Sequence, residues 1–321
     1  MTISPKTILV TGCAGFIASN FVKQFKSEFP ETQIIGLDNF STGKREAVHS
    51  EITFYEASIT DPIALETIFA KHPIDYIFHF AALPRVSYSV ENPAETTLDN
   101  TYGAVLLLEK AKNYGVKRFM FSSTSAVYGN AKSLPVKEAV NDPAPLTPYG
   151  VQKLSDEFFC KMFSELYGLD TVCFRYFNAY GPGQYGDSPY STVISAWLET
   201  LYFPKGKKAY LEGDGEQTRD FCYIDNVVLA NILAMKCEKK LGGEIFNIAH
   251  SERISVNQIK ALIEKYTEQK LDLEQRPGRL GDARDTHADI SKAKEWLGYA
   301  PKINFTDGLI KTIDWFKSRL N

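Results

Sequence analysis

The sequence predicts an α/β protein with a doubly wound, mostly parallel sheet and a smaller, mixed α/β C-terminal lobe. Through the first half of the chain, short segments that are apolar on both faces alternate with helical segments, as in a parallel sheet covered by helices on both sides. The first of these segments ends at a glycine turn that opens directly into a helix. The length of 321 residues, 44% of them hydrophobic, suits two lobes rather than one.

The strands and helices of the first half can be placed in order. We expect strands at residues 7–10, 33–37, 52–55, 75–80, 117–121 and 171–176, and a later one at 244–248. Asp61 is a cap followed by Pro62 at the first helical position, and Pro93 opens another helix in the same way. The longest helices are predicted at 93–114 and 150–167.

The chain changes character after Tyr176. Residues 178–190 are rich in glycine, proline and tyrosine and predict a long loop, after which strict alternation stops. The apolar helix 226–235 and the strand 244–248 are expected to return to the sheet. We therefore expect a first domain of residues 1–177, completed by segments from about 220–250, and a second domain formed mainly by 178–321.

Bulk properties exclude several classes of protein. The net charge of -3 and the pI near 6.0 provide no basic surface for nucleic acid or an anionic membrane. No window approaches the roughly 18 apolar residues of a membrane span, and the early first strand leaves no room for a signal peptide. The five cysteines lack paired spacing, which is typical of reduced thiols, so we expect a cytoplasmic protein. The five histidines lack ligand spacing, and no metal site is expected.

The turn after the first strand reads Thr-Gly-Cys-Ala-Gly-Phe-Ile-Ala and ends at Ala18. A strand, a glycine turn and a helix present free backbone N–H groups and a helix N-terminus to a phosphate. Gly12 permits the tight turn, Gly15 lets a pyrophosphate approach the backbone, and the small Ala18 lets the helix lie close to the strand. Two glycines also occur by chance in many such turns, so the pattern alone is a weak predictor of a dinucleotide site.

Asp38 strengthens the dinucleotide interpretation. It stands at the end of the second strand, 20 residues after Ala18, where an acidic side chain accepts both hydroxyls of an adenosine ribose. A carboxylate there repels a 2′-phosphate, which favours NAD over NADP. The alternative is a loop aspartate that caps a local turn.

Tyr149 and Lys153 form a Tyr-x-x-x-Lys pair at the start of the helix predicted at 150–167. The spacing of four places both side chains on one helical face. A free tyrosine, with a pKa of about 10, is a poor base at neutral pH. We expect a neighbouring ammonium, helped by a cationic nicotinamide, to lower the tyrosine pKa toward the working range. Taken alone, the pair is more typical of an amphipathic helix surface, because any tyrosine and lysine at this spacing match.

Ser122, Ser123 and Thr124 come directly after the strand predicted at 117–121. Ligands of a parallel sheet bind beyond the carboxyl ends of its strands, so these hydroxyls should face the same crevice as the glycine turn. Thr124 is placed to hydrogen-bond a reacting hydroxyl and pass its proton toward Tyr149. The alternative is a cap formed by small polar residues.

Further motifs extend this pattern along the chain. They are Leu37-Asp38-Asn39-Phe40-Ser41-Thr42-Gly43, His79-Phe80-Ala81-Ala82, Ser122-Ser123-Thr124-Ser125-Ala126-Val127-Tyr128-Gly129, Phe174-Arg175-Tyr176-Phe177-Asn178-Ala179-Tyr180-Gly181, Gly213-Asp214-Gly215-Glu216-Gln217-Thr218-Arg219-Asp220-Phe221 and Gly281-Asp282-Ala283-Arg284. In this order they resemble the extended short-chain dehydrogenase/reductases, and within them the nucleotide-sugar 4-epimerases. Two positions depart from that family: Ala18 replaces a third glycine, and Ser58-Ile59 stands where Asp-Ile or Asp-Leu usually holds the adenine.

The resemblance implies a Rossmann-like first domain that binds NAD and a mechanism of oxidation, rotation and reduction. Tyr149 as phenolate would accept the proton of the sugar's 4-hydroxyl, directly or through Thr124, while hydride leaves C4 for NAD, and Lys153 would hold the nicotinamide ribose. The keto sugar would then turn over and be reduced from its other face. By motif, the cofactor residues are Gly12, Gly15, Phe16, Ile17, Asp38, Asn39, Ser41, Thr42, Gly43, Ser58, Ile59, Phe80, Ala81, Ala82, Pro84, Asn100, Ser122, Tyr149, Lys153 and Tyr176.

The resemblance also places the UDP half of a substrate on the second lobe. Asn178 and Arg219 would hold the diphosphate, Val193 and Tyr210 would line the uracil pocket, and Arg279 and Asp282 would contact diphosphate or ribose. The full substrate set by motif is Thr124, Ser125, Ala126, Tyr149, Asn178, Gln184, Thr192, Val193, Tyr210, Arg219, Arg279, Asp282 and Thr286. Without the family, both arginines are more typical of surface charges.

The expected substrate is inferred from positions at which related enzyme families carry different residues. Similar dehydratases carry Asp-Glu where this chain has Ser125-Ala126, so no acid is available to expel a hydroxyl. UDP-glucuronate epimerases carry threonine at the position of Asn178 and an arginine near Tyr185, and neither is present. Thr286, four residues after Asp282, is small, as in UDP-N-acetylglucosamine epimerases. We expect UDP-GlcNAc/UDP-GalNAc as the preferred pair, with UDP-glucose/UDP-galactose second.

Other classes of function stay open at this stage. A nucleotide-sugar reductase, or a non-catalytic NAD-binding regulator, would keep the same glycine turn.

The helices 93–114 and 150–167 are apolar over more than one stripe, so one face covers the sheet and another is free for a second copy. We expect a homodimer through a four-helix contact, as the resemblance also implies; burial within one chain is the alternative.

Overall fold

The centre of this computed structural model, which describes residues 4–188, 191–204, 208–278 and 283–320, is a seven-stranded parallel sheet in the order β11-β6-β5-β4-β1-β2-β3. The strands are β1 (Thr7–Thr11), β2 (Gln33–Asp38), β3 (Thr53–Glu56), β4 (Tyr76–His79), β5 (Arg118–Thr124), β6 (Thr171–Tyr176) and β11 (Glu244–Ile248). The strand order reverses between β1 and β4. In such sheets the carboxyl ends of the strands at the reversal border the ligand crevice.

Alternating side chains of the strands form a separate core on each face. Ile8 and Val10 pack with α1 (Phe16–Glu28) and α8 (Ile224–Lys236), whereas Leu9 belongs to the core on the other face. The helices of that second face are α2 (Pro62–Lys71), α5 (Gly103–Asn113) and α6 (Pro148–Tyr167). Because most positions of the inner strands β1, β4, β5 and β6 are apolar and buried, these strands form short continuous apolar runs in the sequence.

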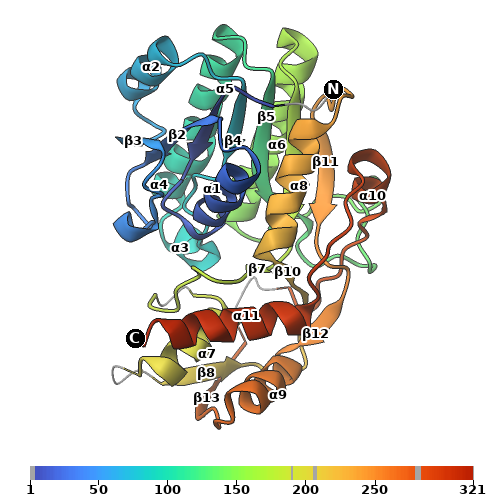
Figure 1. Cartoon of the computed structure of the whole chain (residues 1–321). Helices are drawn as coiled ribbons and strands as arrows, with labels where there is room; N and C mark the ends of the chain where they lie inside the picture. Colours follow the sequence, from blue (N-terminus) through green and yellow to red (C-terminus); the bar gives the residue numbers. More distant parts are fainter. Residues whose placement is uncertain (1–3, 189–190, 205–207, 279–282, 321) are drawn as a thin grey trace.

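The second lobe lies at the carboxyl ends of the central strands (Figure 1). Its helices are α7 (Val193–Tyr202), α9 (Val256–Thr267) and α11 (Phe305–Ser318), whereas α10 (Ser291–Leu297) packs beside β11 and α8. Three two-stranded pairs join β7 (Ala179–Tyr180) to β10 (Cys222–Tyr223), β8 (Ala209–Glu212) to β13 (Leu273–Arg276), and β9 (Thr218–Asp220) to β12 (Arg253–Ser255). The chain leaves this lobe through α8 and β11, which pack on and complete the central sheet.

The predicted fold class is confirmed, with three local differences. β5 continues to Thr124, which pairs with Tyr176, so the Ser-Ser-Thr motif ends the strand rather than following it. The helix predicted at 93–114 is instead α4 (Pro93–Thr97), a π-helical turn η2 (Leu98–Tyr102) and α5. The loop predicted at 178–190 contains the short strand β7.

Shorter elements complete the first lobe. These elements are α3 (Val86–Glu91) and the 3₁₀ turns η1 (Arg45–Ala47) and η3 (Ser125–Tyr128).

Within the ranges that the structure describes, none of the helices combines the length and the hydropathy needed to cross a membrane. All five cysteines carry free thiols.

Candidate active site

The glycine turn is built at the reversal point of the sheet, between β1 and α1. Gly12 has a φ of +71°, and its N–H donates to the carbonyl of Leu37 at 2.7 Å. A Cβ on Gly12 would lie 2.8 Å from the backbone N and Cα of Ala81. Gly15 donates its N–H to the carbonyl of Gly12 at 2.9 Å and immediately precedes α1. Glycine is therefore required at position 12 both for its φ and for the close approach of the segment after β4.

The first turn of α1 is open. No side chain caps its N-terminus, and Phe16 and Ile17 line a cavity. The first N–H groups of a helix have no partner within the helix and carry its positive dipole end. They are therefore available to an anionic group in that cavity.

Asp38 ties the turn to the end of β2. One carboxylate oxygen accepts from the N–H of Ala14 at 3.0 Å, and the other accepts from the N–H of Phe40 at 2.7 Å. Burial raises the pKa of Asp38 above its usual range, and the two backbone hydrogen bonds oppose this rise. The next residue, Asn39, accepts from the N–H of Ser41 at 3.0 Å. The acidic side chain thus has the fixed position that recognition of a ribose requires.

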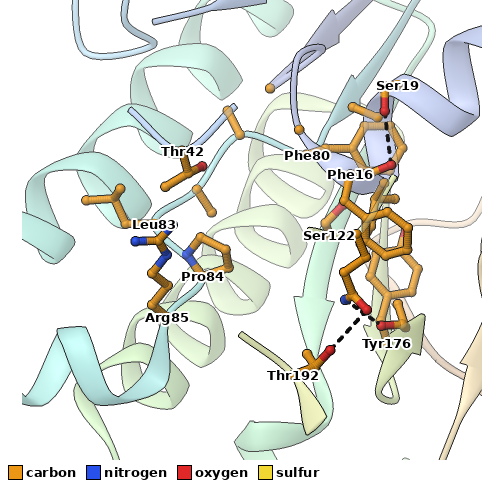
Figure 2. A pocket seen from close by; sticks show the side chains of 18 of the residues that line it. Phe16, Ser19, Thr42, Phe80, Leu83, Pro84, Arg85, Ser122, Tyr176 and Thr192 are labelled. Carbon is orange, nitrogen blue, oxygen red and sulfur yellow. Dashed lines mark hydrogen bonds between the residues drawn. The ribbon is translucent and has the colours of Figure 1, made fainter. Parts of the chain in front are cut away.

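A single cavity of about 890 Å³ extends from the glycine turn to the second lobe. Figure 2 shows one wall formed by Thr42, Leu83, Pro84 and Arg85 and the opposite wall by Phe16, Phe80, Ser122 and Tyr176, with Thr192 entering from the second lobe. Predicted residues that line it are Gly12, Gly15, Phe16, Ile17, Asp38, Asn39, Ser41, Thr42, Ile59, Phe80, Ala81, Ala82, Pro84, Ser122, Thr124, Ser125, Ala126, Tyr149, Lys153, Tyr176, Asn178, Gln184, Thr192, Arg219 and Thr286.

The carboxyl end of β5 and the first turn of α6 meet in this cavity. Thr124, Tyr149 and Lys153 all line it, the Thr124 hydroxyl lowers the pKa of the Tyr149 phenol, and Lys153 lies one turn further along the same helix as Tyr149. The helix start is fixed by Thr147, whose hydroxyl accepts from the N–H of Gly150 at 3.4 Å, and by Pro148 at the first position. A hydroxyl, a phenol and an amine are thus brought together at one side of the cavity.

Burial is the main influence on the pKa of Tyr149. Burial raises it to about 12, and the hydrogen bond from Thr124 opposes this only in part. Burial also lowers the pKa of Lys153, whose ammonium lies 4.6 Å from the centre of the Phe121 ring. Burial is thus the largest influence on both groups: it favours the neutral phenol of Tyr149 and weakens the preference of Lys153 for its charged form.

A buried ionic cluster behind Lys153 holds the ends of β5 and β6 against α6. Glu157 accepts from two nitrogens of Arg175, at 2.9 and 2.6 Å, and also from the hydroxyl of Ser123. The neighbouring Asp156 is fully buried, and burial raises its pKa. Sequence reasoning missed both acids, whose only signal was their position on the helix face of Lys153.

On the second-lobe side, a polar network fixes Thr286. Its hydroxyl accepts from the N–H of Asp220 at 3.1 Å and from the side-chain amide of Asn178 at 3.4 Å. Arg219 donates to the carbonyls of Thr218 and Arg284 at 2.9 and 2.8 Å. Gln184 accepts from the hydroxyl of Thr192 at 3.0 Å. These groups form the polar end of the cavity.

Several predicted contact residues do not line the cavity. Gly43 packs against Ala14, the Ser58 hydroxyl bonds Thr60, and Asn100 is buried with its amide on the backbone of Leu83. Val193 begins α7, and Tyr210 lies on β8 with the guanidinium of Arg276 4.2 Å from its ring centre. Arg279 and Asp282 fall outside the described residues.

Comparison with known proteins decides the family. The model of the NAD dependent epimerase/dehydratase family matches residues 8–249. The chain belongs to this family. It is therefore an NAD-using enzyme of the epimerase/dehydratase family, and its similarities extend over the full length.

Three relatives of this epimerase-family enzyme illustrate the range of substrates. It is 35% identical to a UDP-glucuronate 4-epimerase of Thermodesulfobacterium geofontis, over 97% of this chain and 96% of the relative. It is 39% identical, with a TM-score of 0.92, to a structure of UDP-glucose 4-epimerase from Thermotoga maritima with UDP-glucose, over 98% and 100% of the two chains. It is 34% identical, with a TM-score of 0.90, to a UDP-N-acetylglucosamine 4-epimerase of Methanobrevibacter ruminantium in complex with UDP-N-acetylmuramic acid, over 99% and 100%.

The epimerase-family cavity fits NAD on two independent observations. The open N-terminus of α1 and the close approach at Gly12 form a cradle for a pyrophosphate, and the fixed carboxylate of Asp38 lies at the same end of the cavity. The cavity volume lies within the range of sites for cofactors and small ligands, about 300–1,000 Å³. Ser58 faces Thr60 rather than the cavity, whereas Ile59 lines it, so the departure from the usual adenine motif leaves an apolar contact in place.

The cavity of the epimerase-family enzyme also includes residues that the sequence did not single out. They are, among others, Lys44, Arg85, Asp99, Tyr185, Asp187 and Trp315. Lys44 directly follows a predicted cofactor motif, which was the one available signal. Trp315 and Tyr185 are 130 residues apart in sequence and meet only through the fold.

Proposed function

We propose that this enzyme is a UDP-sugar 4-epimerase whose preferred substrates are UDP-GlcNAc and UDP-GalNAc. The observation that carries the reaction class is that Thr124, Tyr149 and Lys153 line the same cavity as the glycine turn. A base and a phosphate cradle in one cavity suit oxidation and reduction of a hydroxyl on a bound nucleotide sugar.

The first domain would hold the cofactor. In this proposal residues 1–177, with segments from about 220–250, bind NAD, and residues 178–321 mainly bind the UDP-sugar. Gly12, Gly15 and the start of α1 hold the pyrophosphate, and Asp38 holds the adenosine ribose. When bound, the oxidised nicotinamide supplies the acceptor for the hydride from C4 of the sugar.

Tyr149 is the proposed base. Its phenolate takes the proton of the 4-hydroxyl, directly or through the hydroxyl of Thr124, and returns a proton when the 4-keto sugar is reduced on its other face. Lys153 stabilises the phenolate and holds the nicotinamide ribose. Since burial raises the pKa of Tyr149 to about 12, the phenolate needs positive charge in the cavity to form near neutral pH.

The polar end of the cavity is the proposed site for UDP. Asn178 and Arg219, which both line the cavity, would contact the diphosphate. Gln184 and Thr192 would contact the nucleotide or sugar. Val193 and Tyr210 stay outside the cavity walls, so their predicted role at the uracil requires the loop and α7 to adjust around the substrate.

Thr286 supports the preference for N-acetylated sugars. Its short side chain is fixed by Asp220 and Asn178 at the cavity wall, where a tyrosine would place a ring in the space. The UDP-N-acetylglucosamine epimerase of Methanobrevibacter ruminantium supports the same assignment. UDP-glucose and UDP-galactose are the second candidate pair, supported by the Thermotoga maritima enzyme with UDP-glucose.

Product analysis on a panel of UDP-sugars tests the substrate. We expect interconversion of UDP-GlcNAc and UDP-GalNAc to exceed that of the other pairs, and absence of activity on the acetylated pair refutes the preference. UDP-glucuronate belongs in the panel because a relative is named for it. Added NADH should not be consumed, whereas a nucleotide-sugar reductase would oxidise it.

Substitution of the proposed base tests the chemistry. Tyr149→Phe should lower kcat by about 10²–10⁴-fold and leave NAD binding intact, because only the phenolic oxygen is removed. A variant that keeps full turnover shows that Tyr149 is not the base. A wild-type protein that binds NAD and UDP-sugars without any turnover supports the non-catalytic alternative.

We also propose a homodimer in a cytoplasmic setting. The outer side of α6 exposes Val151, Phe158 and Leu166, with 54%, 65% and 67% of their surfaces accessible, and η2 exposes Leu98 and Tyr102. Large apolar side chains gathered on adjacent helices are typical of a face that a second copy covers. The unpaired cysteines are consistent with a reducing compartment.

A further inference from the structure

One lysine of the first lobe reaches across to the second lobe at the cavity. Lys44 is held to the glycine turn by its backbone, whose N–H donates to the carbonyl of Ala14 at 3.1 Å. Its ammonium lies 2.6 Å from a carboxylate oxygen of Asp187 and 3.8 Å from the centre of the Tyr185 ring. All three side chains line the cavity. A charged contact therefore joins the segment after β2 to the loop after β7.

The second-lobe half of this contact is anchored without Lys44. Tyr185 packs edge-on against Trp315 of α11 with ring centres 5.3 Å apart, and the guanidinium of Arg319 lies 4.7 Å from the same tyrosine ring. Arg319 in turn forms two hydrogen bonds, of 2.7 and 3.1 Å, with the mostly buried Glu199 of α7. Asp187 and Tyr185 thus present a prebuilt receptor for one ammonium group.

The same loop has a second attachment to the first lobe. The side-chain amide of Asn20, on α1, donates to the carbonyl of Pro182 at 2.9 Å. The loop therefore contacts the first lobe near the helix that begins at the glycine turn and again at Lys44. Of these two contacts, the one at Lys44 is made by the longer and more flexible side chain, which can release without a backbone change.

We propose that Lys44, Tyr185 and Asp187 form a clasp that retains NAD in the cavity and has to open for the cofactor to leave. The inference rests on NAD as cofactor and on the cavity as its site. A 4-epimerase ends each cycle with the cofactor in its starting oxidation state, so exchange is not needed for turnover. The clasp slows the exchange of bound NAD with NAD in solution, a step that the reaction does not require.

The expected size of the effect follows from the exposure of the pair. The side chains of Lys44 and Asp187 keep 31% and 48% of their surfaces accessible, so the ion pair contributes modestly. The contact of the ammonium with the Tyr185 ring adds a similar amount. Together they correspond to roughly tenfold slower release of NAD, and not to permanent trapping.

The test measures release of NAD rather than turnover of a sugar. NAD-loaded protein is diluted into alcohol dehydrogenase and ethanol, and the absorbance of NADH reports each released molecule. Lys44→Met keeps the aliphatic stem but removes the charge, and Asp187→Asn removes the partner charge. We expect Lys44→Met to release NAD about tenfold faster, Asp187→Asn to release it about threefold faster because the contact with Tyr185 remains, and the double variant to release it no faster than Lys44→Met.

A matched control lies one residue away. Arg45 pairs with Glu56 at 2.8 Å within the first lobe, is more exposed than Lys44, and does not line the cavity. Arg45→Met should leave the release rate unchanged. If Asp187→Asn leaves the rate unchanged while Lys44→Met raises it, or if the two effects multiply, Lys44 holds the cofactor directly and the clasp is refuted.

The outcome is separable from that of the proposed function. A protein that epimerises a UDP-sugar and shows no change of NAD release in either variant refutes the clasp alone. Faster release in both variants of a protein without epimerase activity supports the clasp and refutes the proposed reaction.

Discussion

Gly12 provides a sharp test of the turn that organises the site. In Gly12→Ala, the new residue must keep a φ of +71°, which costs an L-residue about 1–2 kcal/mol. The added Cβ would also lie 2.8 Å from the backbone N and Cα of Ala81 and 3.0 Å from the carbonyl carbon of Phe80. These are backbone atoms that cannot rotate away, and such overpacking costs about 1–3 kcal/mol. The sum is a destabilisation of about 2–5 kcal/mol.

Gly115 separates the two contributions. It has a φ of +69°, but a Cβ there meets no atom within 4 Å. Gly115→Ala should therefore cost only the conformational term of about 1–2 kcal/mol. Replacing glycine by alanine also lowers the conformational entropy of the unfolded chain, which stabilises the folded state. This effect is common to both variants and cancels in the comparison.

The assay is urea unfolding of both variants, with NAD titrations of the folded proteins. We expect a lower urea midpoint for Gly12→Ala than for Gly115→Ala, and at least tenfold weaker NAD binding for Gly12→Ala alone, because the turn must move away from the segment after β4. Equal midpoints would refute the argument from close contact. Unchanged NAD affinity in Gly12→Ala would refute the role of this turn as the phosphate cradle.

Three further predictions concern single side chains. Asp38→Asn should weaken NAD binding at least tenfold, measured by fluorescence titration, because an amide NH₂ then faces the N–H of Ala14 or Phe40. Burial raises the pKa of Asp220 to about 7, so the folded state holds its proton more tightly than the unfolded state, and stability falls as pH rises from about 4 to about 7. Asp220→Asn should remove that decline, measured by urea unfolding across the pH range, and an unchanged slope contradicts the assignment. Phe158→Glu should convert the proposed dimer to a monomer, which sedimentation measures. Helix α6 should stay folded, because the Phe158 side chain is 65% exposed in a single chain. A wild-type protein that sediments as a monomer contradicts the proposed dimer.

The fold was predictable because its strands are apolar at successive positions. Ile8, Leu9 and Val10 are all buried, yet they belong to cores on opposite faces of the sheet, and only a doubly covered sheet needs this pattern. The π-helical turn at Leu98–Tyr102 was not predictable. Its Asn100 bonds both the N–H and the carbonyl of Leu83, and this partner becomes adjacent only after the sheet has formed.

The site was predictable where it follows strand ends and helix starts. Gly12, Asp38, Thr124 and Tyr149 all occupy such positions and line the same cavity. Tyr210, predicted to lie at the uracil, is not among the residues that line the cavity; its strand β8 pairs with β13, and one sequence shows no such pairing. The contact of Lys44 with Asp187 spans 143 residues and has no local signal.

The raised pKa of Tyr149 connects cofactor retention with catalysis. Sequence spacing suggested that Lys153, helped by a cationic nicotinamide, would lower this pKa. Within the protein itself, burial favours the neutral phenol of Tyr149 and lowers the pKa of the Lys153 ammonium. The oxidised nicotinamide is a cation and would add positive charge in the same cavity. In the proposed mechanism, loss of NAD would therefore remove both the hydride acceptor and a charge that favours the phenolate of Tyr149. A clasp at Lys44 therefore protects the protonation state of Tyr149 as well as the occupancy of the cavity.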